Sequence, residues 1–291
     1  MGNNTELKAA FAKTAAAWLL LLPFLAVSQT NLFRISGKKM NSGSFVFGTM
    51  HANDPRLFHF NDSTLPALRS CRYFGMELNV NEVDFMKVAD RIMLKKGVLS
   101  DLYNESEYEL IRRYFADSLH IPILLIQGMK PLYVSTMIET DVASVRDGEP
   151  AMDFFLQTVA DSAGLETIGL EQLEEQLDAI DHISIEEQSE MLLETVKQAI
   201  EGGTGSFMEN MISYYVRGEL DSLLILSEIS IATPEFEREL LTIRNRRMSR
   251  RMIAIMKKGP VFVAVGALHL PGPGGLLDLL RKKGFEVNPL R

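Results

Sequence analysis

The sequence predicts an α/β fold in which a central mixed sheet is flanked by many helices. The first observation is a set of short apolar runs, typical of buried strands, near both ends of the chain, such as 45–47 and 261–265. The second is the long stretch from Glu171 to Met256, whose apolar residues recur almost throughout at helical spacing. Strand segments separated by helical ones are the pattern of a sheet covered by helices.

Six strands are expected in chain order. The first two form a hairpin, because Gly37-Lys38-Lys39 and Asn41-Ser42-Gly43 supply turn residues between them. The next two lie on either side of a mostly helical segment, and the last two close the chain. The expected strands span residues 32–36, 44–47, 73–78, 167–170, 261–265 and 285–287.

Local signals place helix ends in the long helical stretch. Ser184 and Glu187 form the pattern of a capping box, and apolar residues at helical spacing follow them. Thr233-Pro234 is typical of a helix start with proline in the first turn. The glycine-rich segment 202–205 is interpreted as a break between helices and not as a phosphate-binding loop.

The first 28 residues have the pattern of a secretory signal peptide. Lys8 and Lys13 precede an uncharged apolar run from Ala15 to Val27, and Ala26-Val27-Ser28 offers small residues for cleavage. A membrane-spanning helix needs about 20 apolar residues, more than this run contains. We therefore expect export to a periplasm or outside the cell, with residues 29–291 as a single domain and no stable membrane span. The alternative is a retained N-terminal anchor.

Composition and the absence of known motifs exclude several function classes. The net charge of −8 argues against a nucleic-acid partner, whose phosphates require a basic face. The local basic run 244–251 is interpreted as the solvated face of a helix. Cys71 is the single cysteine, so an intrachain disulfide and a cysteine-rich zinc site are both excluded. The chain has no His-Glu-x-x-His, Gly-x-Ser-x-Gly, Walker or Gly-x-Gly-x-x-Gly motif.

Two copies of the pattern Gly-x-x-His are the most informative feature. Gly48-Thr-Met-His51 follows the second expected strand, and Gly266-Ala-Leu-His269 follows the fifth. The carboxyl ends of strands in an open α/β sheet are where ligands bind and catalytic groups collect. The spacing therefore predicts that His51 and His269 share one site, although the glycines alone could serve only the bend from strand to loop.

Two glutamates occupy similar positions. Glu77 belongs to an otherwise apolar strand, and Glu171 follows the strand that ends at Leu170. Burying an ionised carboxylate is costly unless it is paired or coordinates a cation. A divalent metal held by histidine and carboxylate suits zinc, manganese or iron. The alternatives are that Glu77 pairs with an arginine and that Glu171 caps the following helix.

The ordered set of motifs resembles the TraB/GumN family, which includes the Tiki proteases. The resemblance rests on 47–51, 54–56, 76–78, Asp153, 169–171, Arg244-Asn245, 265–270 and 284–287, and it covers nearly all of residues 29–291. It implies a fold similar to the erythromycin esterase and ChaN-like proteins. It also implies that His51, His269 and a glutamate form the functional centre, and that manganese or cobalt is the metal of the Tiki relatives.

These observations predict an exported metal-dependent hydrolase, with a peptide as the expected substrate and another small molecule as the alternative. A divalent transition metal (manganese, cobalt or zinc) would be held by His51, His269 and one of Glu77 or Glu171. The other glutamate would act as general base or orient a ligand. Arg244 would bind a substrate carboxylate or an oxyanion, and Asn245 would donate a hydrogen bond to it. The alternative function is a non-catalytic protein that binds a peptide or other ligand in the same cleft, and a haem-binding role rests on fold likeness alone.

Overall fold

The computed structural model describes residues 30–37, 40, 42–52, 54–79, 85–142, 151–230 and 233–290. The expected signal peptide, residues 1–28, lies outside the described residues and stays a prediction. Within the described ranges, no helix is long and apolar enough to cross a membrane.

The α/β class is confirmed: a six-stranded mixed sheet has the order β4-β3-β5-β2-β1-β6. Strands β4, β3, β5 and β2 are parallel, whereas β1 runs antiparallel to both β2 and β6. The expected hairpin of β1 and β2 is present, with Leu32 opposite Phe47. The strands are β1 Leu32–Ser36, β2 Ser44–Thr49, β3 Tyr73–Met76, β4 Glu166–Gly169, β5 Val261–Gly266 and β6 Glu286–Leu290.

Strand β5 forms the centre of the sheet because it is apolar on both faces. Its residues from Val261 to Val265 are all buried, as expected for a parallel strand covered on both sides. The ring of Phe262 packs against those of Phe47 and Phe74 on the neighbouring strands. The aromatic contacts and the continuous apolar run fix β5 between β3 and β2.

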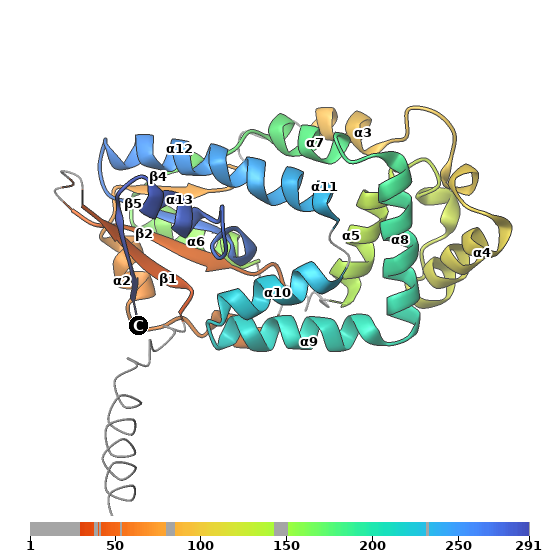
Figure 1. Cartoon of the computed structure of the whole chain (residues 1–291), viewed down its shortest axis with the longest axis horizontal. Coiled ribbons are helices and arrows are strands. Elements are labelled where there is room, and N and C mark those ends of the chain that lie inside the picture. The colour runs from red at the N-terminus through yellow and green to blue at the C-terminus, as the bar shows by residue number, and fades with distance from the viewer. Residues whose placement is uncertain are drawn as a thin grey trace, which may run out of the picture.

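Helices surround the sheet and extend beyond it (Figure 1). Two of the hydrophobic cores account for this shape: one surrounds the sheet, and a second lies among α4, α5 and α8. The helices are α2 Thr64–Arg69, α3 Phe85–Ile92, α4 Glu105–Arg113, α5 Pro131–Val142, α6 Met152–Ser162, α7 Leu173–Asp181, α8 Ile185–Ile200, α9 Gly203–Val216, α10 Leu220–Ser230, α11 Pro234–Glu237, α12 Arg244–Met256 and α13 Leu276–Lys282. Short 3-10 or π segments are η1 Pro55–Phe58, η3 Leu99–Leu102, η4 Tyr114–Ser118, η5 Ile123–Leu125, η6 Arg238–Ile243 and η7 Ala267–His269.

The expected helix starts are confirmed with one difference. Ser184 caps α8 by accepting a hydrogen bond from the N–H of Glu187, and Thr233 caps α11 in the same way. In a full capping box, the Glu187 side chain would accept a hydrogen bond from the N–H of Ser184. The Glu187 carboxylate instead accepts a hydrogen bond from the Thr233 hydroxyl. The glycine-rich break is also shorter than expected: α9 begins at Gly203, and Gly202 has the positive φ of 74°.

The interpretation of residues 244–251 as a solvated helix face is wrong for part of the run. Arg247 and Arg251, with Arg244, lie on one face of α12 because they are spaced three and four residues apart. That face points at acidic residues: Arg251 binds Glu175, and Arg247 also approaches the Glu175 carboxylate. Ion pairing with acids near the end of β4 therefore offsets the cost of placing these guanidinium groups against the protein.

Candidate metal centre at the carboxyl edge of the sheet

The strand order brings the predicted site residues to one edge of the sheet. Strands β4, β3, β5 and β2 are parallel neighbours, so their carboxyl ends lie side by side. Glu171 follows β4, Glu77 directly follows β3, His269 ends the η7 turn after β5, and His51 follows β2. Residues that are far apart in the sequence therefore lie in one row.

His269 is buried and held from behind. Its Nδ1 lies 2.7 Å from Oδ1 of Asn245, whose Nδ2 donates to the carbonyl of Gly274 at 3.1 Å. Because that amide oxygen can only accept, the ring proton belongs on Nδ1, and Nε2 presents its lone pair. Burial lowers the pKa of His269 below the ordinary 6.5, so the ring is neutral at neutral pH. His269 is thus presented as an electron-pair donor.

Glu77 faces His269. Its Oε1 accepts a hydrogen bond from the N–H of Gly266 at 2.8 Å and lies 3.6 Å from Nε2 of His269. Its Oε2 accepts a hydrogen bond from Arg244 at 2.6 Å. Burial acts to raise the pKa of Glu77, but the charge of His269 when its ring is protonated at low pH, the charge of Arg244 and the Gly266 hydrogen bond lower it to about 2. Glu77 is therefore an ionised carboxylate in the site.

Glu171 lies beyond Glu77, on the side away from His269, and it binds Arg244. Its Oε2 accepts hydrogen bonds from Nε and Nη2 of Arg244 at 2.9 and 2.7 Å and from Gln176 at 3.1 Å. Its Oε1 is buried without a hydrogen-bond partner among the described residues, 3.7 Å from Arg247. Arg244 uses its remaining nitrogen on the carbonyl of Leu240. The guanidinium thus bridges the two glutamates, and each of its three nitrogens donates at least one hydrogen bond within the protein.

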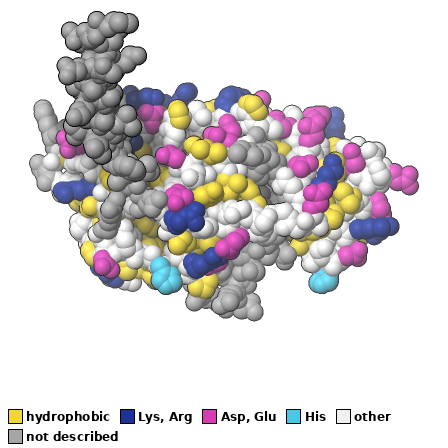
Figure 2. Space-filling model, turned by 60° about the horizontal axis from the view of Figure 1, so that its bottom comes forward, with side chains coloured by type: hydrophobic (Ala, Val, Ile, Leu, Met, Phe, Trp, Pro, Cys, Tyr) yellow, Lys and Arg dark blue, Asp and Glu magenta, His cyan; other side chains and the backbone are white. Residues whose placement is uncertain are grey.

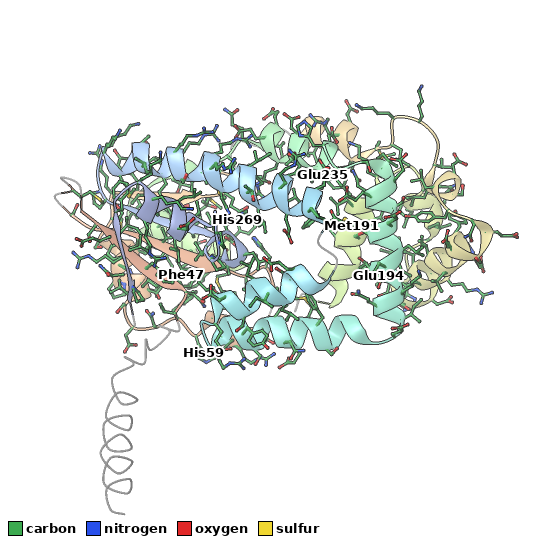
Figure 3. All side chains as sticks on the ribbon, in the orientation of Figure 1. Phe47, His59, Met191, Glu194, Glu235 and His269 are labelled. Carbon is green, nitrogen blue, oxygen red and sulfur yellow. The ribbon has the colours of Figure 1, made fainter. Side chains whose placement is uncertain are left out.

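His51 lies on the open side of the site. Its side chain is 64% exposed, and its Nδ1 is 3.2 Å from Oδ2 of Asp153 on α6. The other oxygen of Asp153 accepts a hydrogen bond from the hydroxyl of Thr49 at 2.8 Å. Burial raises the pKa of Asp153, while the charge of His51 and the Thr49 hydroxyl act against that shift. In contrast, His59 is exposed at the molecular surface and takes no part in this group (Figure 3).

The glycines of the two Gly-x-x-His motifs are needed for close approach. Neither has a positive φ. A Cβ added to Gly48 would lie 2.9 Å from Leu270 and 3.1 Å from the backbone of Ala267, and one added to Gly266 would lie 3.2 Å from Oε1 of Glu77. The first motif therefore packs on the second without room for a side chain.

Asp153 and Tyr215 complete the surroundings of His51. Asp153 entered the sequence analysis as one of the motif residues behind the family resemblance, without a role in the site, and Tyr215 was not singled out. The Tyr215 hydroxyl donates to the carbonyl of Gly48 at 2.7 Å and so fixes the end of β2. The signal that could have identified Asp153 is an acidic residue in the first turn of an otherwise apolar helix start, Met152 to Leu156. No sequence signal distinguishes Tyr215 from other helical tyrosines.

The geometry tests the expected metal centre. Two ligands about 2.1 Å from one ion lie roughly 3.5 Å apart, and Nε2 of His269 is 3.6 Å from Oε1 of Glu77. Across the described residues, however, no three His, Cys, Asp or Glu side chains are gathered closely enough to hold a metal ion. The spacing of His269 and Glu77 is that of two ligands of one metal ion, and the described side chains do not bring a third such donor to the pair.

Comparisons with known proteins identify relatives of this chain. The model of the TraB/PrgY/gumN family matches residues 31–289. The chain is 31% identical to Metalloprotease TIKI2 of Danio rerio over 84% of this chain and 58% of that protein. It is 30% identical to Metalloprotease TIKI1 of Homo sapiens over 86% of this chain and 60% of that protein.

The chain spans less than two thirds of the length of these TIKI relatives. An uncharacterized protein of Treponema pallidum (strain Nichols) is 23% identical over 91% of this chain and 89% of its own length. No solved structure matches the chain. Because the family model covers nearly all of the sheet and its helices, the chain belongs to the TraB/PrgY/gumN family.

Proposed function

We propose that this chain is a metal-dependent hydrolase that cleaves peptides. The observation that carries the proposal is the pair of oriented histidines: Nδ1 of His269 is held by Asn245, and Nδ1 of His51 lies against Asp153. Metal-binding histidines characteristically place their second ring nitrogen against a carboxylate or carbonyl oxygen, which fixes the tautomer. The relatives named metalloproteases support the same reading.

The proposed ligands are His51, His269 and Glu77. Both glutamates bind Arg244, and Glu77 is preferred because its Oε1 lies 3.6 Å from Nε2 of His269. Manganese, cobalt and zinc all accept this set of nitrogen and oxygen donors. When bound, such an ion polarises a carbonyl and lowers the pKa of a water molecule. The exposed side of His51 is then where a peptide enters.

The other residues of the site orient the three proposed ligands. Arg244 keeps Glu77 ionised and fixes the direction of its carboxylate, and Glu171 holds Arg244 in place. Asn245 sets the tautomer of His269, and the Asp153 carboxylate, whose Oδ2 lies 3.2 Å from Nδ1 of His51 without a hydrogen bond, orients His51 by its charge. We therefore assign Arg244 and Asn245 positioning roles in place of the substrate and oxyanion contacts expected from the sequence.

The first test is metal content together with peptide cleavage. Purified full chain is compared with the His51→Ala, His269→Ala double variant and with His59→Ala as a matched exposed-histidine control. About one transition metal per chain and peptide cleavage are expected for the parent and the control, and neither for the double variant, with circular dichroism unchanged in all three. Absence of metal after reconstitution with manganese, cobalt and zinc would overturn the metal centre. Metal without turnover, with peptide binding retained, would favour the non-catalytic binder.

Export is part of the proposal, since the positively charged start and short apolar run of residues 1–28 are typical of a signal peptide. Amino-terminal sequencing of the protein recovered outside the cytoplasm should begin near Gln29. An intact Met1 on exported protein would instead support a retained anchor.

A further inference from the structure

The end of the molecule opposite the sheet contains α4 (Figure 1). The segments 93–96 and 123–125 belong to this helical part and carry exposed apolar side chains. Leu124 and Leu125 are 79% and 72% exposed, the highest values among the exposed large hydrophobic residues of the described chain, and Met93 is 44% exposed. Lys95 and Lys96 follow Met93 on the neighbouring segment and are also exposed. We call these five residues the apolar tip. Figure 2 shows hydrophobic side chains next to Lys and Arg side chains at the surface of this end.

The apolar tip is held in shape by the backbone. The N–H of Leu94 donates to the carbonyl of Gly128 at 2.7 Å, and the N–H of Leu99 donates to Gln127 at 2.8 Å. The two leucines stand on the 3-10 turn η5, and the next residue, Ile126, is buried in the second core. The two leucines are therefore exposed on a turn that is itself anchored. Replacing either side chain should not disturb the packing of the core.

The two lysines make the apolar tip locally basic on an acidic protein. The structure shows no ion pair for Lys95 or Lys96 with any described residue. The nearest acids along the chain are Asp90 and Asp101, and the carboxylate of Asp101 accepts a hydrogen bond from the N–H of Val98 at 3.0 Å. With a net charge of −8, the molecule as a whole would be repelled by an anionic surface. Lys95 and Lys96 therefore supply a local attraction on the segment next to Leu124 and Leu125, the two most exposed large hydrophobic residues of the described chain.

We propose that the apolar tip docks on an anionic lipid surface, with Leu124, Leu125 and Met93 entering the interface and Lys95 and Lys96 facing the headgroups. Amphipathic surfaces of this type bury apolar side chains at the headgroup boundary and gain attraction from basic residues. A stable protein partner needs about 800 Å² on each side, which three protruding side chains do not provide. A bilayer accepts a small convex projection without a matching surface.

The test places a probe at the tip. Cys71 is buried and is the single cysteine, so Leu125→Cys can be labelled selectively with an environment-sensitive fluorophore. The full-length labelled protein is mixed with vesicles of phosphatidylcholine alone or with added phosphatidylglycerol. A blue shift and quenching by brominated lipid are expected with the anionic vesicles. The same label on Val216→Cys, 48% exposed on α9, is the control and should not respond.

Two further variants make the result decisive. Replacing Lys95 and Lys96 by glutamine should weaken the fluorescence response about fivefold per lysine, since each basic residue near an anionic surface contributes about one kcal/mol. Leu124→Asn in the labelled protein should weaken it about tenfold or more, because an inserted leucine is lost. No response at position 125, or an equal response at position 216, would overturn the proposal. A shift that depends on protein concentration without vesicles would assign the tip to a second copy of the chain.

Discussion

At the residue scale, the two histidines of the repeated motif are treated differently by their surroundings. His269 is buried and is held by the neutral amide of Asn245, next to the Arg244 and Glu77 charges. His51 is exposed and lies against the carboxylate of Asp153. One histidine is thus fixed by packing, whereas the other depends on a single acidic neighbour for its orientation.

Asp153→Asn is expected to lower metal affinity by about 10- to 100-fold, the usual effect of losing a carboxylate behind a metal-binding histidine. The side chain keeps its size, so the fold should be unchanged. The measurement is competitive metal titration against a chelating indicator, with thermal unfolding of the metal-free protein. Asp161→Asn, an exposed change on the same helix, serves as the control. Equal affinities for Asp153→Asn and the parent would remove Asp153 from the site.

At the element scale, α12 links the site to the rest of the molecule. Arg244, Arg247 and Arg251 lie on one helical face and meet the acids near the end of β4 and the start of α7. Asn245, the next residue after Arg244, reaches His269 on the other side. The π segment η6 directly precedes α12. One helix start therefore orients both Glu77 and His269, so changes in its packing are expected to reach the site.

A cluster of ion pairs connects α3, the start of α5 and α7. It leads to a prediction about how the stability of the fold depends on pH. Asp181 accepts a hydrogen bond from the buried Lys130 and from Arg91. Burial acts to raise the pKa of Asp181, but the hydrogen bond and charge of Lys130 and the charge of Arg91 lower it below its ordinary value. A carboxyl with a lowered folded-state pKa stabilises the fold above its unfolded pKa of about 3.9, and that stabilisation is lost as pH falls through the folded value.

Asp181→Asn should therefore lower the free energy of unfolding at pH 7 by about 2 kcal/mol, since it leaves Lys130 buried without its partner. The difference from the parent should shrink as the pH falls below about 4. Urea unfolding at several pH values measures both effects. Asp178→Asn is a matched control, because Asp178 is more exposed and binds only the same Arg91. A loss for Asp181→Asn that does not change with pH would contradict the ionic account.

At the scale of the whole molecule, the site and the second hydrophobic core are separate. The proposed ligands directly follow strands β2, β3 and β5 or the turn after them, and the packing of these strands belongs to the core around the sheet. The second core, among α4, α5 and α8, includes the fully buried Ile138 and Ile111. Lys130, Asp181 and Arg91 join the helices between these regions.

Ile138→Ala is expected to destabilise the protein by about 2–5 kcal/mol, because it opens a cavity in the second core. Metal content at a temperature where the variant is folded should remain that of the parent. Unfolding by urea and metal analysis of the same sample give the two values. Loss of metal from folded Ile138→Ala would show that the helical region shapes the site directly.

The sequence by itself determined the fold class, the strands and the chemical types at their ends. Alternating or continuous apolar runs identified all six strands, and the boundaries shifted by a few residues, as for β2, which continues to Thr49. The repeated Gly-x-x-His motif identified His51 and His269, because the chemistry of a strand end is local. Capping side chains likewise predicted the starts of α8 and α11.

Only the tertiary structure decided which of these groups meet. The order β4-β3-β5-β2 places Glu77 next to His269 and puts Arg244 between Glu77 and Glu171, an arrangement that no local pattern carries. Asp153 reaches His51 through the packing of α6 on the sheet, across about a hundred residues of chain. The physical reason is that pairing partners are selected by strand order and core packing, which are properties of the folded chain and not of any segment.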